Sequence, residues 1–151
     1  MEWFNEFLGN KTLINPLVAW LIAQIIKFFL YLIMNKEIRF ERIFGDGGMP
    51  SGHSATVSAL TVTSMLEYGV GSFQFAISGI LAIIVMHDAS GVRLETGKHA
   101  KAINEIFEML QTFGDDTEEI KMEKLRELVG HTRLQVFCGM LLGIAVALIF
   151  R

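Results

Sequence analysis

The sequence predicts an all-α integral membrane protein: a helical bundle with about four transmembrane helices, plus two amphipathic helices in the cytoplasmic connection. Three observations predict this fold class. They are long uncharged apolar runs, lysines and arginines gathered in two connections, and helical spacing of apolar residues between the last two runs. The length of 151 residues suits one domain, so residues 1–151 are expected to form a single membrane domain.

Three apolar runs predict spanning helices, because each is close to the roughly 20 residues that cross the hydrocarbon. They cover residues 16–34, 72–88 and 134–150. The alternative is a soluble bundle with very apolar buried helices. Three such runs in a chain of 151 residues leave little polar surface for a water-soluble coat, which favours the membrane.

A fourth span, residues 51–66, is less apolar because serines and threonines dilute it, although no charge precedes Glu67. In a helix, Ser54, Ser58 and Thr61 share one face, and small residues of this kind allow close helix packing. We therefore expect an inner helix here.

The connection between the last two spans predicts two surface helices. Apolar residues recur at helical spacing over residues 98–111 and again over 117–130, where Asp116 and Glu119 resemble a capping box. Both helices are expected to lie on the cytoplasmic face, above the bundle.

The positive charges predict the orientation. With four spans, residues 35–50 and 87–133 lie on one side of the membrane, opposite residues 67–71 and both termini. These two connections hold ten of the thirteen lysines and arginines, which predicts that their side is cytoplasmic. No positive leader precedes the first span, so we expect a multi-pass protein whose first span stays attached.

Charge and cysteine content exclude several classes. The net charge is −3 and no long basic run exists, so nucleic acid is not an expected partner. The single cysteine excludes an internal disulfide framework and a cysteine-rich zinc site. No cofactor and no metal are expected.

The most specific motif covers residues 47–54, a glycine-rich turn that leads directly into a helix. Backbone N–H groups at a helix start bind anions, and Gly48, Ser51, Gly52 and Ser54 allow a phosphate to approach closely. His53 stands where it could protonate a bridging oxygen. The alternative is an ordinary loop with a helix cap.

Together with Gln24 and Lys27, residues 88–93 and residues 127–132, this motif resembles the type-2 phosphatidic acid phosphatase and vanadium haloperoxidase superfamily. The chain is similar to its divergent, short membrane branch over essentially the whole length. The resemblance implies a phosphohydrolase acting on a lipid phosphate or pyrophosphate without a metal. Ser51 and Gly52 would hold the phosphate, and His53 would be the general acid.

Two superfamily motifs differ in this chain. Met34 stands seven residues after Lys27, where Arg-Pro is expected, and His99 follows Arg93 at six residues with Ile103 in place of the expected aspartate. The roles of these missing motif residues must therefore be taken by other residues of the chain.

Lys27 is predicted to bind the phosphate, with Gln24 on the same helical face, because a lysine at such depth needs an anionic partner. That partner could instead be Asp88. Arg93 offers bidentate contact to phosphate, and the alternative is a salt bridge between Asp88 and Arg93 at a helix end.

His131 is the predicted nucleophile, oriented by Asp88 or Glu127; the alternative is a histidine that caps a helix. The expected substrate is a phospholipid or isoprenoid phosphate. Two other functions stay open. One is a non-catalytic membrane protein that binds or moves a phospholipid headgroup, and the other is a metal-dependent site of His87, Asp88 and Glu127.

In the last span, Gly139 and Gly143 form a G-x-x-x-G pair. Small residues at this spacing predict close packing within the bundle or, alternatively, a homodimer through these two glycines.

Overall fold

The computed structural model describes residues 2–36, 48–113, 125 and 130–151, and the elements in these ranges are α-helices. They are α1 (Glu2–Gly9), α2 (Lys11–Asn35), α3 (Gly52–Tyr68), α4 (Phe73–Ser90), α5 (Val92–Phe113) and α6 (Arg133–Ile149). The all-α fold predicted from the apolar runs is thus confirmed. Each of the four expected spans corresponds to one helix: α2, α3, α4 and α6.

Three of these helices begin at a hydroxyl side chain that caps the first turn. Ser51 accepts a hydrogen bond from the Ser54 amide, and Ser72 accepts one from the Phe75 amide. Thr132 and Gln135 form a full capping box at the start of α6. Each cap satisfies a backbone donor that the helix cannot pair, so the helix starts are fixed locally.

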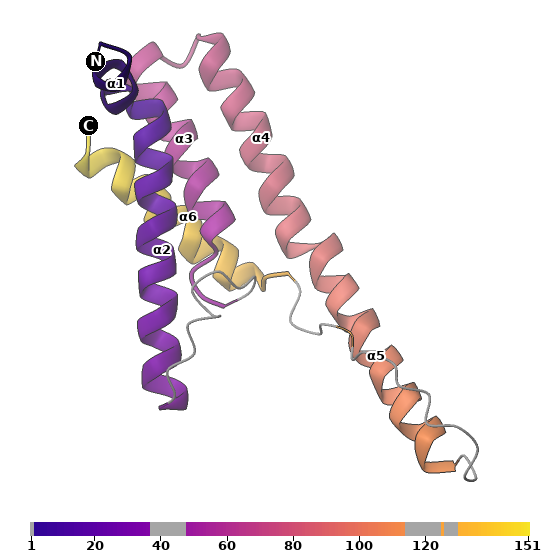
Figure 1. Ribbon diagram of the computed structural model, residues 1–151. Helices are drawn as coiled ribbons and strands as arrows, with labels where there is room; N and C mark the ends of the chain where they lie inside the picture. Colours follow the sequence, from indigo (N-terminus) through magenta and orange to yellow (C-terminus); the bar gives the residue numbers. More distant parts are fainter. Residues whose placement is uncertain (1, 37–47, 114–124, 126–129) are drawn as a thin grey trace.

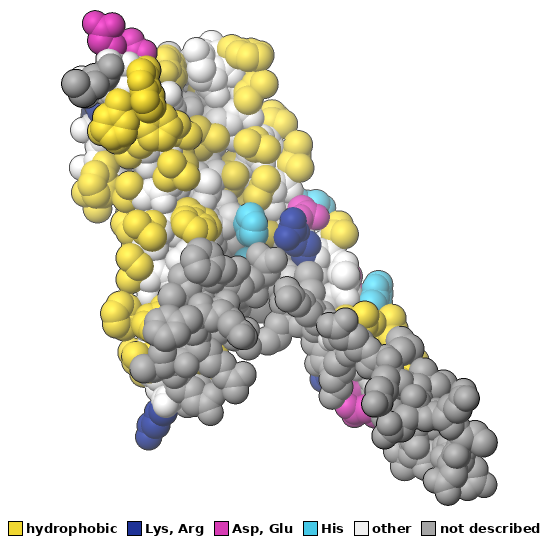
Figure 2. Space-filling model, in the orientation of Figure 1, with side chains coloured by type: hydrophobic (Ala, Val, Ile, Leu, Met, Phe, Trp, Pro, Cys, Tyr) yellow, Lys and Arg dark blue, Asp and Glu magenta, His cyan; other side chains and the backbone are white. Residues whose placement is uncertain are grey.

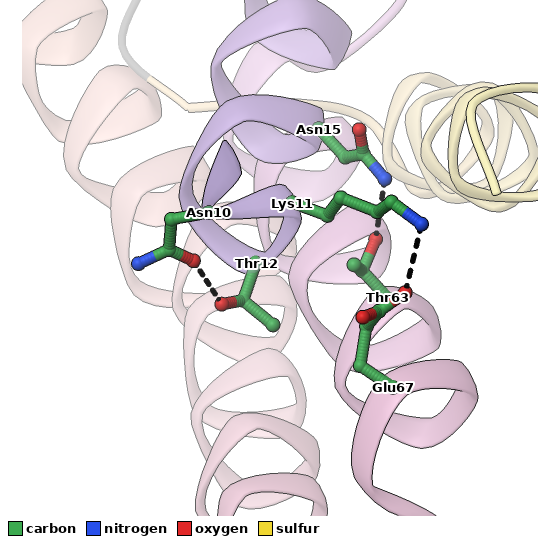
Figure 3. Close-up of polar contacts among 6 residues, drawn as sticks. All are labelled: Asn10, Lys11, Thr12, Asn15, Thr63 and Glu67. Atoms are coloured by element: carbon green, nitrogen blue, oxygen red, sulfur yellow. Dashed lines mark hydrogen bonds and ion pairs between the residues drawn. The ribbon is translucent and has the colours of Figure 1, made fainter. Parts of the chain in front are cut away.

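The four long helices α2, α3, α4 and α6 form the bundle, and α3 packs against the other three (Figure 1). Both termini and the α3–α4 turn lie at one end. Near that end, Lys11 forms an ion pair with Glu67 at 3.3 Å, and Asn15 donates a hydrogen bond to Thr63 at 3.1 Å (Figure 3). These contacts fix α2 and α3 as antiparallel neighbours, and the prediction that α3 is the inner helix is confirmed.

The side chains are distributed as in a membrane protein. The buried core cluster is built from small residues, namely Ala19, Ala23, Ala55, Ala59 and Val146. Large apolar side chains of α2, α4 and α6 are exposed instead, and Figure 2 shows them over much of the bundle surface. Such a surface is costly in water but suits lipid, whereas small residues at the interfaces let helices approach closely.

The contact between α3 and α6 depends on two glycines. A methyl group added to Gly139 would meet the Ser51 carbonyl oxygen, and one added to Gly143 would meet the Ala55 carbonyl oxygen. Both glycines are thus used for packing within the chain, as the first of the two interpretations predicted. A homodimer through them stays a prediction.

Among the described residues, two stretches are long and apolar enough to cross a membrane: Lys11–Met34, and Phe73–Met109 across α4 and α5. Helices α3 and α6 are shorter, with 17 residues each. At 1.5 Å per residue they are about 26 Å long, slightly less than a hydrocarbon core of about 30 Å.

The first expected surface helix, residues 98–111, lies within α5, which already begins at Val92. In Figure 1, α5 continues away from the bundle in nearly the direction of α4, so it does not lie above the bundle as expected. The short break at Gly91 explains the difference, because it interrupts the helix without reversing the chain. Apart from Leu125 and Gly130, the second expected surface helix, 117–130, lies outside the described residues, as does its Asp116–Glu119 capping box.

Candidate functional site

The candidate site is built around the start of α3. Ser51 and Ser54 are completely buried, and the Ser54 hydroxyl donates a hydrogen bond to Ser51 Oγ at 3.0 Å. The Ser51 amide donates to the carbonyl oxygen of Gln135 in α6 at 3.0 Å. The motif turn is therefore anchored to α6, and the first amides of α3 form the positive end of a helix dipole.

Helix α2 places Lys27 and Gln24 beside this turn. A methyl group added to Gly48 would lie 3.5 Å from Cδ of Lys27, and one added to Gly52 would lie 3.5 Å from Nε2 of Gln24. Both side chains are buried, with 8% and 7% of their surface exposed. Because α2 continues to Asn35, eight residues at 1.5 Å each put Lys27 about 12 Å from the end of that helix.

The Gln24 amide has an unusual environment. Its Oε1 atom is completely buried and has no hydrogen-bond partner within the described part of the chain. An unsatisfied buried amide costs about 1–3 kcal/mol. A group that carries this cost beside a helix start is a candidate ligand for a bound molecule.

Two histidines meet at the site. The rings of His53 and His131 lie 6.3 Å apart between centroids, with their planes at 62° to each other. His53 is exposed on the first turn of α3, whereas only 3% of the surface of His131 is exposed. The His131 amide donates to the Ala89 carbonyl oxygen at 2.9 Å, and its Nδ1 lies 3.3 Å from Gln135 Oε1. The backbone of His131 is therefore held by α4, and its ring by Gln135 of α6.

Asp88 and Arg93 lie at the junction of α4 and α5, where Arg93 Nε donates to Asp88 Oδ2 at 2.8 Å. Gly130, with φ +88°, packs directly on the backbone of Arg93 and Leu94, so a side chain there would collide with α5. This contact brings the junction next to His131. The ion pair given above as the alternative for Asp88 and Arg93 is present, and both side chains are partly exposed.

Comparison with known proteins identifies the family. The model of the Divergent PAP2 family matches residues 8–146. The chain belongs to this family. It is also 38% identical to an uncharacterized membrane protein, YuiD of Bacillus subtilis (strain 168), over 95% of this chain and 96% of the relative. No solved structure matches the chain. The protein is thus a helical membrane protein of the Divergent PAP2 family.

In this Divergent PAP2 protein, most residues predicted for the site lie around one point. We call this group the cradle; it consists of Gln24, Lys27, Gly48, Ser51, Gly52, His53, Ser54 and His131. Asp88 and Arg93 adjoin it through the backbone of Ala89 and Gly130. Glu127 lies outside the described residues. Within those ranges, no group of three His, Cys, Asp or Glu residues could hold a metal ion.

Sequence reasoning missed two residues that contact the cradle. Gln135 contacts both Ser51 and His131, and Trp20 lies against Gly52. Thr132 and Gln135 do carry a signal, because a threonine followed by a glutamine three residues later is a capping box. Nothing in the sequence marks Trp20, since exposed and buried tryptophans look alike in an apolar run.

Proposed function

We propose that this protein is a phosphohydrolase that removes phosphate from a lipid phosphate or lipid pyrophosphate through a phosphohistidine. The observation that carries the proposal is the pair of histidines 6.3 Å apart, one of them on the first turn of α3, together with a buried lysine against Gly48 in the turn that precedes that helix. Membership of the Divergent PAP2 family supports the same reaction class.

The cradle has the chemistry of a phosphate site. The amides at the start of α3 and the Lys27 ammonium supply positive charge, and the Ser51 hydroxyl, which accepts from Ser54, has its own hydrogen as a further donor. Arg93 contacts Asp88 through its Nε atom, and its terminal nitrogens would provide a fork of donors at the rim. Several charge-assisted hydrogen bonds would stabilise the equatorial oxygens during transfer.

In the proposed reaction, a ring nitrogen of His131 forms a bond to phosphorus while the bond from phosphorus to the lipid oxygen breaks. The electron pair of that bond stays on the oxygen, which takes a proton from His53. Water then attacks phosphorus and gives a proton to His53, while the bond from phosphorus to His131 breaks. Phosphate leaves and both histidines return to their first state.

The separation of the rings fits an in-line transfer. An attacking nitrogen approaches phosphorus to about 3–3.5 Å before reaction. A proton donor lies about 2.6–3.2 Å from the leaving oxygen. With the bond that breaks between them, these distances put the two reacting nitrogens roughly 7–8 Å apart, which two rings with centroids 6.3 Å apart can cover when each nitrogen lies on the far side of its centroid.

A second function is a non-catalytic membrane protein that binds or moves a phospholipid headgroup through the same cradle. The ion pair between Asp88 and Arg93 favours it, because part of the positive charge at the rim is already compensated. Both functions use Lys27 and the start of α3, so only turnover separates them.

We further propose that the protein is multi-pass, with the cradle on the cytoplasmic side. The helices alternate in direction, so α3 and α6 both begin at the same end of the bundle. Residues 35–50 and 87–133, which precede these two helices in the sequence, hold ten of the thirteen lysines and arginines, and the positive-inside rule assigns their side to the cytoplasm.

The test is phosphate release from a panel of phospholipid and isoprenoid phosphates by the purified protein in detergent, with EDTA and with vanadate. His53→Ala and His131→Ala are each expected to lower release by at least about 100-fold. His87→Ala and His99→Ala are the matched controls, because both histidines are exposed outside the cradle, and they should keep full release.

Three results would contradict the proposal in different ways. Release that is abolished by EDTA would indicate a metal enzyme. Headgroup binding without turnover would favour the non-catalytic function. Full turnover by His131→Ala would remove that residue as nucleophile while keeping the reaction class.

A further inference from the structure

The His131 ring faces a side chain whose orientation is fixed independently. Gln135 Oε1 accepts the Thr132 backbone N–H at 3.0 Å, and His131 Nδ1 lies 3.3 Å from the same atom. An amide oxygen and an amide nitrogen look alike, but a backbone N–H can only donate, so the atom that faces it is the oxygen. Nδ1 therefore has an acceptor opposite it and must carry a hydrogen to bond with it.

This arrangement selects one form of the ring. A neutral histidine with its hydrogen on Nδ1 has its lone pair on Nε2, which is the form a nucleophile needs. An aspartate or glutamate at the same place would also stabilise the charged imidazolium, which has no lone pair to attack with. The neutral amide of Gln135 favours the Nδ1–H tautomer without stabilising the charged imidazolium.

Gln135 also contacts the other half of the cradle. Its carbonyl oxygen accepts the Ser51 amide at 3.0 Å, and Ser51 caps the helix that carries His53. One turn later, Gly139 lies against the Ser51 carbonyl oxygen. One residue of α6 thus links the turn before His53 to the ring of His131.

We propose that Gln135 is the positioning residue for His131, holding it as the Nδ1–H tautomer with Nε2 ready to attack phosphorus. This inference rests on the proposed function. It assigns to Gln135 the orienting role that the sequence suggested for Asp88, whose Oδ2 accepts from Arg93. Glu127 lies outside the described residues and stays a prediction.

The experiment measures the His131 ring by ¹⁵N NMR in the full-length protein in detergent, with His131→Asn to assign its signals. The native ring should show hydrogen on Nδ1. Gln135→Met, which keeps the length but removes the acceptor, should give a mixture of tautomers and lower kcat about 100-fold with KM little changed. Gln135→Glu restores an acceptor and should recover the Nδ1–H form, with a kcat between those of Gln135→Met and the native protein because the carboxylate also stabilises the imidazolium.

Thr132→Ala is the matched control. It removes the other half of the capping box but leaves the Gln135 amide on His131, so tautomer and kcat should stay close to native. An equal loss in Thr132→Ala and Gln135→Met would overturn the inference, because the role of Gln135 would then be helix capping. A native ring with its hydrogen on Nε2 would overturn it without any variant.

The two proposals fail separately. Absence of turnover on every lipid phosphate would refute the phosphohydrolase, yet the tautomer of native His131 and its change in Gln135→Met would still decide the role of Gln135.

Discussion

At the start of α3, the Gln24 amide is buried beside Gly52 without a hydrogen-bond partner for Oε1 among the described residues. Gln24→Leu should therefore raise stability by about 1–3 kcal/mol, because it removes an unsatisfied polar group. If Nε2 of this amide donates to phosphate, the same change should raise KM about 10-fold, as expected for a lost hydrogen bond to a charged group. Thermal unfolding and the KM for a lipid phosphate measure the two effects.

Asn15→Leu is the control on the same helix. Asn15 is also a buried amide, but it donates to Thr63 far from the cradle. Its loss leaves the Thr63 hydroxyl without this partner, so stability should fall while KM stays constant. A KM for Gln24→Leu equal to that of the native protein would show that Gln24 does not contact the substrate.

The residues of the cradle differ in how far the sequence could predict them. The glycines and serines of residues 47–54 carry a local signal, because a turn and a helix start are made by neighbouring residues. The partner of His131 is less clearly marked, since Asp88, Glu127 and Gln135 are all plausible partners by sequence. The capping box at Thr132 and Gln135 was the signal that could have indicated Gln135.

Among the helices, the contact between α3 and α6 is the one most sensitive to side-chain size. A methyl group on Gly143 would meet the backbone of α3 at Ala55 and Ala59, which cannot move aside as a flexible side chain would. Gly143→Ala should therefore lower stability by about 1–3 kcal/mol through overpacking. Thermal unfolding in detergent measures this change.

Gly79→Ala in α4 should change stability in the opposite direction, because nothing lies within 4 Å of the added methyl group. Alanine favours a helix over glycine by roughly 0.5–1 kcal/mol, so this variant should be slightly more stable than the native protein. Equal stability of the two variants would mean that α6 does not pack on α3 as described. Loss of a dimer in Gly143→Ala without loss of stability would support the homodimer instead.

Element positions follow from the sequence only where the pattern is local. The apolar runs predicted α2, α4 and α6 to within a few residues, apart from five additional residues at the start of α2, and the small residues of 51–66 predicted the inner helix. The direction of α5 was not predictable, because Gly91 and Val92 are compatible with a turn as well as with a short break. The first turn of α3 lies opposite Gln24 and Lys27 of α2. This position depends on how the two helices pack, and the spacing of residues in the sequence does not determine it.

For the whole molecule, the depth of the cradle matters most. Lys27 lies about 12 Å from the end of α2, and the last turns of that helix expose Phe29, Ile33 and Met34. A headgroup that reaches Lys27 is therefore below the level of these apolar side chains. A charge at such depth costs about 2.5–3.5 kcal/mol on insertion scales, and in the proposed function a bound phosphate would contribute to offsetting this cost.

The orientation of this bundle can be tested with one pair of cysteines. Val70 is 70% exposed in the α3–α4 turn, and Lys101 is exposed on α5 at the other end. In a Cys138→Ser background, an impermeant maleimide added to intact cells should label Val70→Cys and leave Lys101→Cys unlabelled until the cells are opened. The reason is that the positive connections stay in the cytoplasm.

Labelling of both positions from outside would contradict the multi-pass arrangement. Labelling of Lys101→Cys alone would reverse the orientation and place the cradle on the outer face, where only lipid phosphates of the outer leaflet could reach it.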